Sequence, residues 1–260
     1  MKALITGATS GIGKSMAYKL IERGWELILT GRNEEVLNSL KEELGGSVEI
    51  IAADLADRSE VFRVYSFCEG KGVDMLVNNA GYGLFGAFDE TSLDAELDMI
   101  SVNITAVHIL TKLFLRDFKK RNSGIILNVA SSAGFLTGPL MSTYYASKNY
   151  VVRLSMAIAE ELRRSGSGVS ITVLCPGPVD TSFNDRAGVT FSAKPITADY
   201  AAEYAIRKAF AGQLLAVPGL AIQAALFASR FVPHRLLSAA VYEIQHAKRP
   251  SGAAASDRRK

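Results

Sequence analysis

A glycine-rich turn near the start of the chain constrains its fold more than any other feature. Residues 2–6 form a short apolar run, and the next residues read Gly-Ala-Thr-Ser-Gly-Ile-Gly. Glycines at these places allow a tight turn, close approach of the backbone to a ligand, and close packing of a helix on a strand. The free amides and the dipole at the start of that helix favour a bound phosphate. The predicted phosphate-binding residues are Gly7, Thr9, Ser10, Gly11, Ile12 and Gly13.

Short apolar runs then alternate with amphipathic segments along the chain. Strands are predicted at residues 2–6, 26–30, 48–53, 73–77, 124–130, 169–174 and 214–217, and helices at residues 12–23, 34–44, 59–69, 103–120 and 142–164. Strands that are nearly all apolar are typical of parallel sheets covered on both faces. The pattern predicts an α/β fold, a Rossmann-type doubly wound parallel sheet of about seven strands with helices on both faces.

We see no repeat and no linker before about residue 250, so the chain is predicted to be a single domain. Residues 1–217 would form the dinucleotide-binding and catalytic unit, residues 218–250 a C-terminal helical extension of it, and residues 251–260 a disordered tail. The extension is densely apolar and also contains Arg230 and Arg235. We expect helices that pack on the domain or cover a substrate cleft, with a membrane-surface or partner-binding helix as the alternative.

Composition excludes several functional classes. The net charge of +3 is too small for a nucleic-acid footprint, and part of the basic excess lies in the last residues. Two cysteines supply no disulfide framework, which indicates a reducing, cytoplasmic location, or one at the inner face of a membrane. We detect no secretory signal, and the segment nearest to membrane-spanning length is residues 214–229. None of the three histidines has a companion at metal-ligand spacing, so no metal site is predicted.

The end of the second predicted strand indicates which dinucleotide would bind. An acidic residue is expected there for NAD, because it would bind the ribose hydroxyls, but the sequence continues Thr-Gly-Arg-Asn. Arg32 is able to pair with a 2′-phosphate through two hydrogen bonds, with Asn33 beside it, although an arginine at a strand end is often only solvated. We therefore predict NADP(H) in preference to NAD(H).

A tyrosine and a lysine four residues apart form the predicted catalytic pair. Tyr144 and Lys148 would lie one turn apart on one face of a helix, and Ser131 precedes the tyrosine by thirteen residues. A phenol has a pKa of about 10, and a nearby ammonium would lower that pKa and favour proton exchange near neutral pH. The pair alone is weak evidence, since such spacing arises often by chance.

Further motifs fall in a recognisable order along the chain. Asp54 follows the third predicted strand, the run Asn-Asn-Ala-Gly at residues 78–81 follows the fourth, and Asn103 and the Pro-Gly pair at residues 176–177 complete the set. With the glycine turn and the catalytic pair, they make the chain resemble the short-chain dehydrogenase/reductase family, in its single-domain branch of about 250 residues. The resemblance covers about residues 1–217.

The resemblance implies an oxidoreductase that acts on CH–OH groups with a nicotinamide cofactor. Tyr144 would exchange a proton with the substrate oxygen, and Ser131 would hold that oxygen. Lys148 would bind the nicotinamide ribose and lower the pKa of Tyr144, and Asn103 would anchor a water that links the lysine to solvent. The nicotinamide itself would carry the hydride.

The resemblance also assigns the remaining cofactor contacts. Asp54 would meet the adenine amino group with Leu55 beside it, and the backbone of Val179 and the hydroxyl of Thr181 would bind the carboxamide. The other predicted contacts lie in the loops after the fourth and sixth strands and are Asn79, Ala80, Gly81, Pro176 and Gly177.

The predicted substrate is a small, apolar carbonyl compound or alcohol. This rests on residues in loops that face the substrate side in the family, namely Tyr82, Leu84, Phe85, Phe135, Leu136, Met141, Phe183 and Phe191. About half of these would be ordinary packing, and Arg186 and Lys194 weaken the argument against an acidic substrate.

Two alternatives stay open for the activity. One is a 3-oxoacyl thioester reductase, although residues 82–86 lack the charged continuation usual in the acyl-carrier-protein enzymes. The other is a catalytically idle NADP(H) sensor or scaffold, which the presence of Asn103, Ser131, Tyr144 and Lys148 disfavours. Because the extension would block one face that the family uses for tetramers, we expect a homodimer rather than a tetramer.

Overall fold

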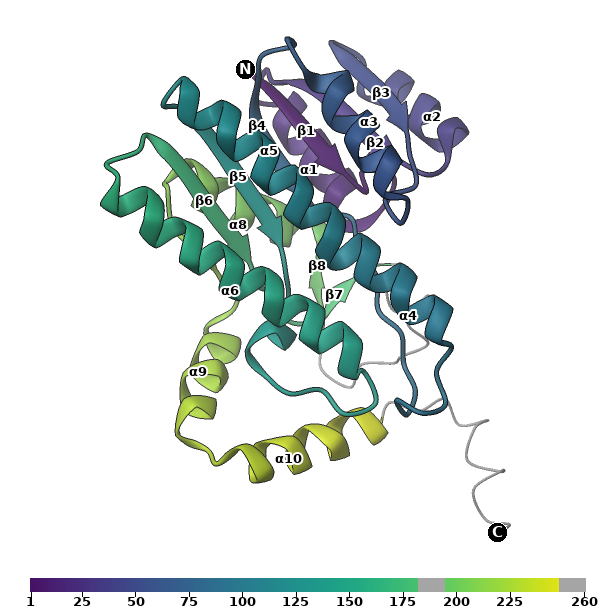
Figure 1. Ribbon diagram of the computed structural model, residues 1–260, viewed down its shortest axis with the longest axis vertical. Helices are drawn as coiled ribbons and strands as arrows, with labels where there is room; N and C mark the ends of the chain where they lie inside the picture. The colour runs from purple at the N-terminus through teal and green to yellow at the C-terminus, as the bar shows by residue number, and fades with distance from the viewer. Residues whose placement is uncertain (182–194, 248–260) are drawn as a thin grey trace.

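The computed structural model describes residues 1–181 and 195–247. Its centre is a parallel sheet with the strand order β3-β2-β1-β4-β5-β6-β9 (Figure 1). The strands are β1 (Lys2–Thr6), β2 (Glu26–Gly31), β3 (Val48–Ala52), β4 (Val73–Asn78), β5 (Gly124–Val129), β6 (Val169–Leu174) and β9 (Leu215–Ala216). Each corresponds to a predicted strand, so the doubly wound parallel sheet is confirmed. A second, two-stranded sheet of β7 (Val179–Asp180) and β8 (Ile196–Thr197) is not among the predicted elements.

Helices cover both faces of the sheet. The α-helices are α1 (Gly11–Ile21), α2 (Glu34–Leu44), α3 (Arg58–Cys68), α4 (Leu93–Ile100), α5 (Val107–Lys120), α6 (Ser142–Arg164), α8 (Ala198–Phe210), α9 (Leu220–Ala228) and α10 (His234–His246). Short turns of other helix types occur at Ser101–Ala106, Ser132–Phe135 and Ser229–Phe231. In Figure 1, α3, α5 and α6 lie in front of the sheet and α1, α2 and α8 behind it.

The alternation of side chains along β1 explains these two layers. Ala3 and Ile5 belong to one core cluster with residues of α1, α2 and α8, whereas Leu4 belongs to another with residues of α3, α5 and α6. Successive side chains of a strand point to opposite faces, so a run that is apolar at every position needs a helix layer on each side. Both clusters are fully buried around β1, which places the core on the two faces of the central strands.

The helix predicted at residues 103–120 begins earlier than expected. It starts at Leu93, where the hydroxyl of Ser92 accepts a hydrogen bond from the amide of Ala95 at 3.4 Å, and it continues through a π-helical turn to Lys120. A serine in this position satisfies an otherwise unpaired amide of the first turn. The helix α8 is not among the predicted helices, and its first turn is capped in the same way by Thr197.

One helix of the described residues has the length and apolar character of a membrane span, and it is not the segment that the sequence singled out. Leu93–Lys120 contains 28 residues, and 44% of its most apolar window is buried inside the structure. Its α5 part packs on the sheet through Leu110, Phe114 and Phe118, as expected for a core helix. Residues 214–229, by contrast, are divided between β9 and α9.

A buried chain of amide and hydroxyl groups attaches the two longest helices to the sheet. Asn78 of β4 donates hydrogen bonds to Thr111 of α5 at 3.0 Å and to Asn128 of β5 at 2.9 Å, and Asn128 donates to Ser155 of α6 at 3.0 Å. Buried polar groups need such partners, and their directionality fixes how the helices are placed. The network therefore sets the position of α5 and α6 relative to the central strands.

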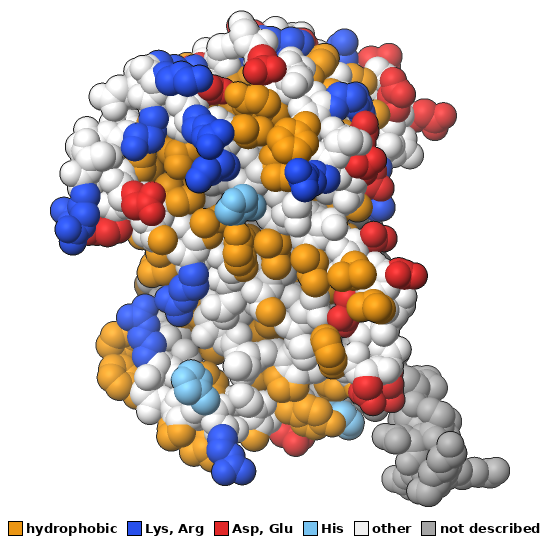
Figure 2. Space-filling view, in the orientation of Figure 1, with side chains coloured by type: hydrophobic (Ala, Val, Ile, Leu, Met, Phe, Trp, Pro, Cys, Tyr) orange, Lys and Arg blue, Asp and Glu red, His pale blue; other side chains and the backbone are white. Residues whose placement is uncertain are grey.

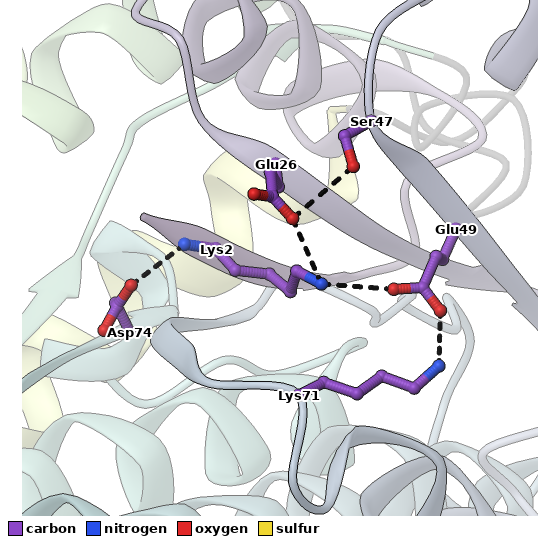
Figure 3. A network of polar contacts seen from close by, with 6 residues as sticks. All are labelled: Lys2, Glu26, Ser47, Glu49, Lys71 and Asp74. Carbon is purple, nitrogen blue, oxygen red and sulfur yellow. Dashed lines mark hydrogen bonds and ion pairs between the residues drawn. The ribbon is translucent and has the colours of Figure 1, made fainter.

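Charged side chains near the amino ends of β1, β2, β3 and β4 form a network of polar contacts (Figure 3). The ammonium of Lys2 lies 3.2 Å from carboxylate oxygens of both Glu26 and Glu49, and Glu49 also pairs with Lys71. The backbone amide of Lys2 donates to Asp74 of β4 at 3.0 Å. The contacts occupy the edge of the sheet opposite to the carboxyl ends of the strands.

The chain beyond β9 forms α9 and α10, which lie past the carboxyl ends of the strands in Figure 1. Helices are thus present within residues 218–247, as expected. The predicted tail at residues 251–260 and the candidate residues Phe183, Arg186, Phe191 and Lys194 lie outside the described residues.

Candidate active site

The carboxyl ends of the parallel strands open into a cleft of about 430 Å³. Loops that follow β1 to β6 all contribute to its walls, as is usual for ligand sites of doubly wound sheets. The sequence-predicted residues that line it are Gly7, Thr9, Ser10, Gly11, Ile12, Arg32, Asn33, Asp54, Leu55, Asn79, Ala80, Gly81, Ser131, Tyr144, Lys148, Pro176, Gly177, Val179 and Thr181. Two predicted residues, Gly13 and Asn103, lie just behind the walls.

The first turn has the geometry that a bound phosphate needs. Gly7 and Gly11 have φ angles of 63° and 54°, a region that favours glycine. A Cβ atom on Gly13 would come within 2.3 Å of the Asn79 side-chain nitrogen and 2.4 Å of the carbonyl oxygen of Gly7. Ser10, at the N-cap of α1, makes no side-chain cap hydrogen bond. The amides of the first turn of α1 are therefore placed to meet an anion in the cleft.

Asn79 holds this turn in place. Its side-chain amide donates to the carbonyl oxygens of Thr6 at 3.0 Å and Gly7 at 2.9 Å, and its backbone amide donates to the Thr6 hydroxyl at 3.0 Å. The asparagine after β4 thus hydrogen-bonds to the end of β1.

Arg32 and Asn33 directly follow β2, and their side chains have different surroundings. The side chain of Asn33 accepts a hydrogen bond from the amide of Val36 at 3.0 Å and so caps α2. Arg32 is exposed on the cleft wall and makes no ion pair with any residue that the structure describes. Its guanidinium is free to bind an anion.

Tyr144 and Ser131 meet in the cleft. Tyr144 is 8% exposed, and its side chain is hydrogen-bonded to that of Ser131. Burial raises the pKa of Tyr144 above its ordinary value, and the hydrogen bond from Ser131 offsets only part of that rise. The expected lowering of this pKa is therefore not what the structure gives, because desolvation outweighs the other effects on the phenolate. The phenol holds its proton at neutral pH and is able to donate it.

Lys148 lies one turn further along α6. Its ammonium donates to the carbonyl oxygen of Val129 at 3.0 Å and lies 5.9 Å from the centre of the Tyr144 ring. Burial lowers the pKa of Lys148 to about 8. The lysine is thus poised to exchange a proton in the range where enzymes usually work.

Asn103 lies in the π-helical turn between α4 and α5 and is fully buried. Its side-chain oxygen accepts from the amide of Tyr82 at 3.1 Å, and its nitrogen donates to the carbonyl oxygen of Tyr82 at 2.9 Å and to the hydroxyl of Ser147 at 3.0 Å. A Cβ on Gly81 would lie 2.9 Å from the Asn103 oxygen and 3.2 Å from the Lys148 nitrogen. Asn103 therefore joins the loop after β4 to the catalytic helix, and π-helical turns are frequent at functional sites.

Ser147, Tyr145 and Gln245 are among the residues of the site that the sequence did not predict. Ser147 connects Asn103 to α6 and also donates to the carbonyl oxygen of Tyr144 at 2.7 Å. Tyr145 lines the cleft beside Tyr144, and Gln245 of α10 reaches the same wall and hydrogen-bonds to the hydroxyl of Tyr145. No signal in the sequence links Gln245 to a residue that precedes it by one hundred positions.

The predicted substrate-side residues divide into two groups. Tyr82, Leu84, Phe85 and Met141 belong to an apolar cluster that surrounds Tyr144. Phe135 packs instead with residues of β6 and α6 in a separate cluster. Leu136 is half-buried and its carbonyl oxygen accepts from Asn149 of α6 at 3.4 Å. The structure therefore assembles an apolar wall from part of the predicted set.

Comparison with known proteins identifies the relatives of this chain. The family model described as short chain dehydrogenase matches residues 1–190. A very-long-chain 3-oxoacyl-CoA reductase of Anas platyrhynchos is 34% identical over 207 residues, which are 76% of this chain and 65% of that protein.

Two solved structures have the same fold. A short-chain dehydrogenase from Sphingobium yanoikuyae in complex with NADPH has a TM-score of 0.80 and 28% identity and covers 99% of each chain. A short chain dehydrogenase/reductase from Burkholderia phymatum in complex with NAD has a TM-score of 0.79 and 28% identity, covering 87% of this chain and 91% of that one.

The buried ammonium of Lys148 leads to a prediction about stability. Its pKa is about 8 when folded and roughly 10.4 when unfolded, so between these values the unfolded chain binds more protons and stability rises with pH. We expect Lys148→Met to be more stable than the wild type at pH 7 by about 1–3 kcal/mol, with the gap closing near pH 10. Urea unfolding without added nucleotide measures it.

Lys112→Met, at an exposed lysine of α5, is the matched control and should change stability by less than about 0.5 kcal/mol. A Lys148→Met protein less stable than the wild type at pH 7 would contradict the effect assigned to burial.

Proposed function

The chain belongs to the short-chain dehydrogenase family, and we propose that within it the chain is an NADP(H)-dependent enzyme that interconverts a carbonyl and an alcohol on an apolar substrate. That it is an oxidoreductase that uses a nicotinamide dinucleotide follows from the family. The main support for carbonyl–alcohol chemistry on an apolar substrate is the hydrogen-bonded pair of Tyr144 and Ser131 beside the buried Lys148. An apolar cluster surrounds this part of the cleft.

The cleft fits the cofactor that the family implies. The positive φ angles of Gly7 and Gly11 and the uncapped first turn of α1 suit a pyrophosphate, and the backbone of Gly81 lies where any side chain would collide with Asn103. Asp54 would hold the adenine end, and Lys148 and Thr181 the nicotinamide end. When bound, the nicotinamide supplies or accepts the hydride.

We assign the proton transfer to residues of this chain. In the reductive direction Tyr144 donates its phenolic proton to the carbonyl oxygen of the substrate, while the hydroxyl of Ser131 hydrogen-bonds to the same oxygen. Lys148 stabilises the phenolate that results and passes a proton back to it. Asn103 positions this helix through Ser147, and a water bound at Asn103 would connect Lys148 to solvent. The raised pKa of Tyr144 suits this direction, since the phenol starts protonated.

Removing the phenolic hydroxyl tests this assignment. Tyr144→Phe should lower the rate of NADPH oxidation with ketones by about 10²–10⁴-fold, because the general acid is lost. Nucleotide affinity, measured by fluorescence titration, should change little. Tyr150→Phe, on the same helix but at the surface against His108, is the matched control and should keep wild-type turnover. Full activity of Tyr144→Phe would overturn the mechanism.

Arg32 supports the choice of NADP(H). It is the exposed cation at the end of β2 where an NAD enzyme usually has an acid, and it is not neutralised by an ion pair within the described residues. A guanidinium and a phosphate form paired, charge-assisted hydrogen bonds, whereas the ribose hydroxyls of NAD offer Arg32 no charge.

The cofactor preference is measured by titrating both reduced dinucleotides. We expect the wild type to bind NADPH more tightly than NADH, and Arg32→Ala to weaken NADPH binding about 10–100-fold with little effect on NADH. Arg153→Ala, at an exposed arginine of α6, controls for the loss of one positive charge. Tighter binding of NADH than NADPH by the wild type would refute this role of Arg32.

A second candidate function is reduction of a 3-oxoacyl thioester. It is favoured by the similarity to the 3-oxoacyl-CoA reductase, although this chain spans only 65% of that protein's length. A screen of NADPH oxidation against ketones, aldehydes, quinones, steroids and acyl thioesters separates the two candidates.

We also propose that the protein is cytoplasmic and that it forms a homodimer rather than a tetramer. We propose further that its C-terminal extension contacts a membrane surface. Figure 2 shows hydrophobic and basic side chains gathered on α9 and α10. Leu220, Phe227, Phe231 and Leu236 are 61–83% exposed, and Arg230 lies among them. Exposed apolar side chains beside positive charge suit the boundary of an anionic bilayer, where apolar substrates also collect.

Flotation with vesicles that contain anionic lipid tests this contact. The double variant Phe231→Ser with Leu236→Ser should lose most vesicle binding, because two large apolar side chains no longer insert. Phe88→Ser is the matched control, since Phe88 is 68% exposed but lies outside the extension. Equal flotation of the double variant and the wild type would exclude the contact.

A further inference from the structure

Gln245 is the one residue of the described extension that reaches the catalytic cleft. It belongs to the last turn of α10, lines the cleft with Tyr144 and Tyr145, and is 1% exposed. Glutamine is rarely buried to this degree in a helix that otherwise lies at the surface. Its neighbours in space come from a different part of the chain, the start of α6.

Only the nitrogen of the Gln245 side-chain amide has a hydrogen-bond partner among the described residues. The side-chain nitrogen donates a hydrogen bond to the hydroxyl of Tyr145, but the side-chain oxygen has less than 1 Å² exposed and has no hydrogen-bond partner among the described residues. A buried amide oxygen without a donor is destabilising relative to an apolar group of the same shape. An amide here is therefore explained best by a donor from outside the described residues.

Gln245 is one of the two buried residues of α10, and the other is Val241. Val241, one turn earlier, is 6% exposed and supplies an apolar contact, and the hydroxyls of Ser238 and Thr137 are hydrogen-bonded at 2.7 Å. Gln245 lines the cleft, so a ligand bound there is the external group that lies nearest to its amide. The cleft near Tyr145 is also where the apolar cluster of Met99, Met141 and Tyr144 lies.

We propose that Gln245 is a specificity-determining residue whose amide oxygen accepts a hydrogen bond from a hydroxyl or N–H group of the substrate, at a point away from the reacting carbonyl. This rests on the proposed function, in which Tyr144 and Ser131 hold the carbonyl oxygen. The substrate class is then an apolar body that carries a carbonyl at one end and a hydrogen-bond donor at the other. Tyr145 positions the amide through its own hydrogen bond to Gln245.

A series of paired ketones tests the proposal. Each straight-chain methyl ketone is compared with the methyl ketone of the same length that carries a terminal hydroxyl, and with its terminal methyl ether, which accepts but does not donate. At the length that spans the cleft, we expect kcat/KM for the hydroxyl compound to exceed that of the other two by roughly tenfold in the wild type, the effect of one neutral hydrogen bond.

Substitutions of Gln245 distinguish a loss of substrate recognition from a general loss of structure. Gln245→Met keeps the size but loses the acceptor, so the ratio of kcat/KM within each trio should fall to about one. Gln245→Glu keeps an oxygen acceptor, and a preference for the hydroxyl compound should survive. Because each ratio compares substrates on the same protein, loosening of α10 affects all three alike. Gln223→Met, at an exposed glutamine of α9, should keep the wild-type ratio.

Binding measurements separate this proposal from the proposed function. Calorimetric affinity of the NADP⁺-loaded protein for a diol and for the mono-alcohol of the same length should show the same tenfold preference, lost in Gln245→Met, even if no ketone in the series is reduced. Equal affinities and equal kcat/KM values at every length would overturn the role of Gln245 while leaving ketone reduction intact. If the methyl ether were preferred as strongly as the hydroxyl compound, the assignment of Gln245 as a hydrogen-bond acceptor would be overturned.

Discussion

Every part of the site depends on the parallel alignment of β1, β4, β5 and β6. Parallel strands end at the same edge of a sheet, so the glycine turn after β1, Gly81 after β4 and Ser131 after β5 meet there, although Gly7 and Ser131 are 124 positions apart. The hydrogen bonds of Asn79 to the end of β1 and of Asn78 to Asn128 fix this alignment from within. At the opposite edge, the ion pairs of Lys2 join β1 to β2 and β3, and its backbone amide joins β1 to β4.

Burial governs the chemistry of the catalytic pair. The same desolvation that raises the pKa of Tyr144 lowers that of Lys148, so both groups are displaced toward their neutral forms. The lowered pKa of Lys148 favours proton exchange near neutral pH but reduces the stability of the fold. Such a trade-off between activity and stability is common in enzymes. Asn103 and Ser147 then restrict where α6 lies, so that this pair keeps one geometry.

The sequence predicts the sheet and most of the cleft because both follow from local patterns. Apolar runs of four to seven residues identify the strands, and glycines at fixed spacing identify the turn. What it does not predict depends on tertiary context. The pKa of Tyr144 follows from burial rather than from spacing, the helix of Asn103 begins ten residues early at a serine cap, and Gln245 enters the cleft from a helix without any local motif. The family resemblance ends near residue 217, so it gives no help with α10.

The extension is attached far more lightly than the sheet. As the structure describes them, α9 buries none of its residues and α10 buries only Val241 and Gln245. Segments with so few buried contacts open at a small fraction of the free energy of global unfolding. The wall of the cleft that carries Gln245 is therefore the part of the site that we expect substitutions to alter with the least effect on the nucleotide-binding turn and on the core of the sheet.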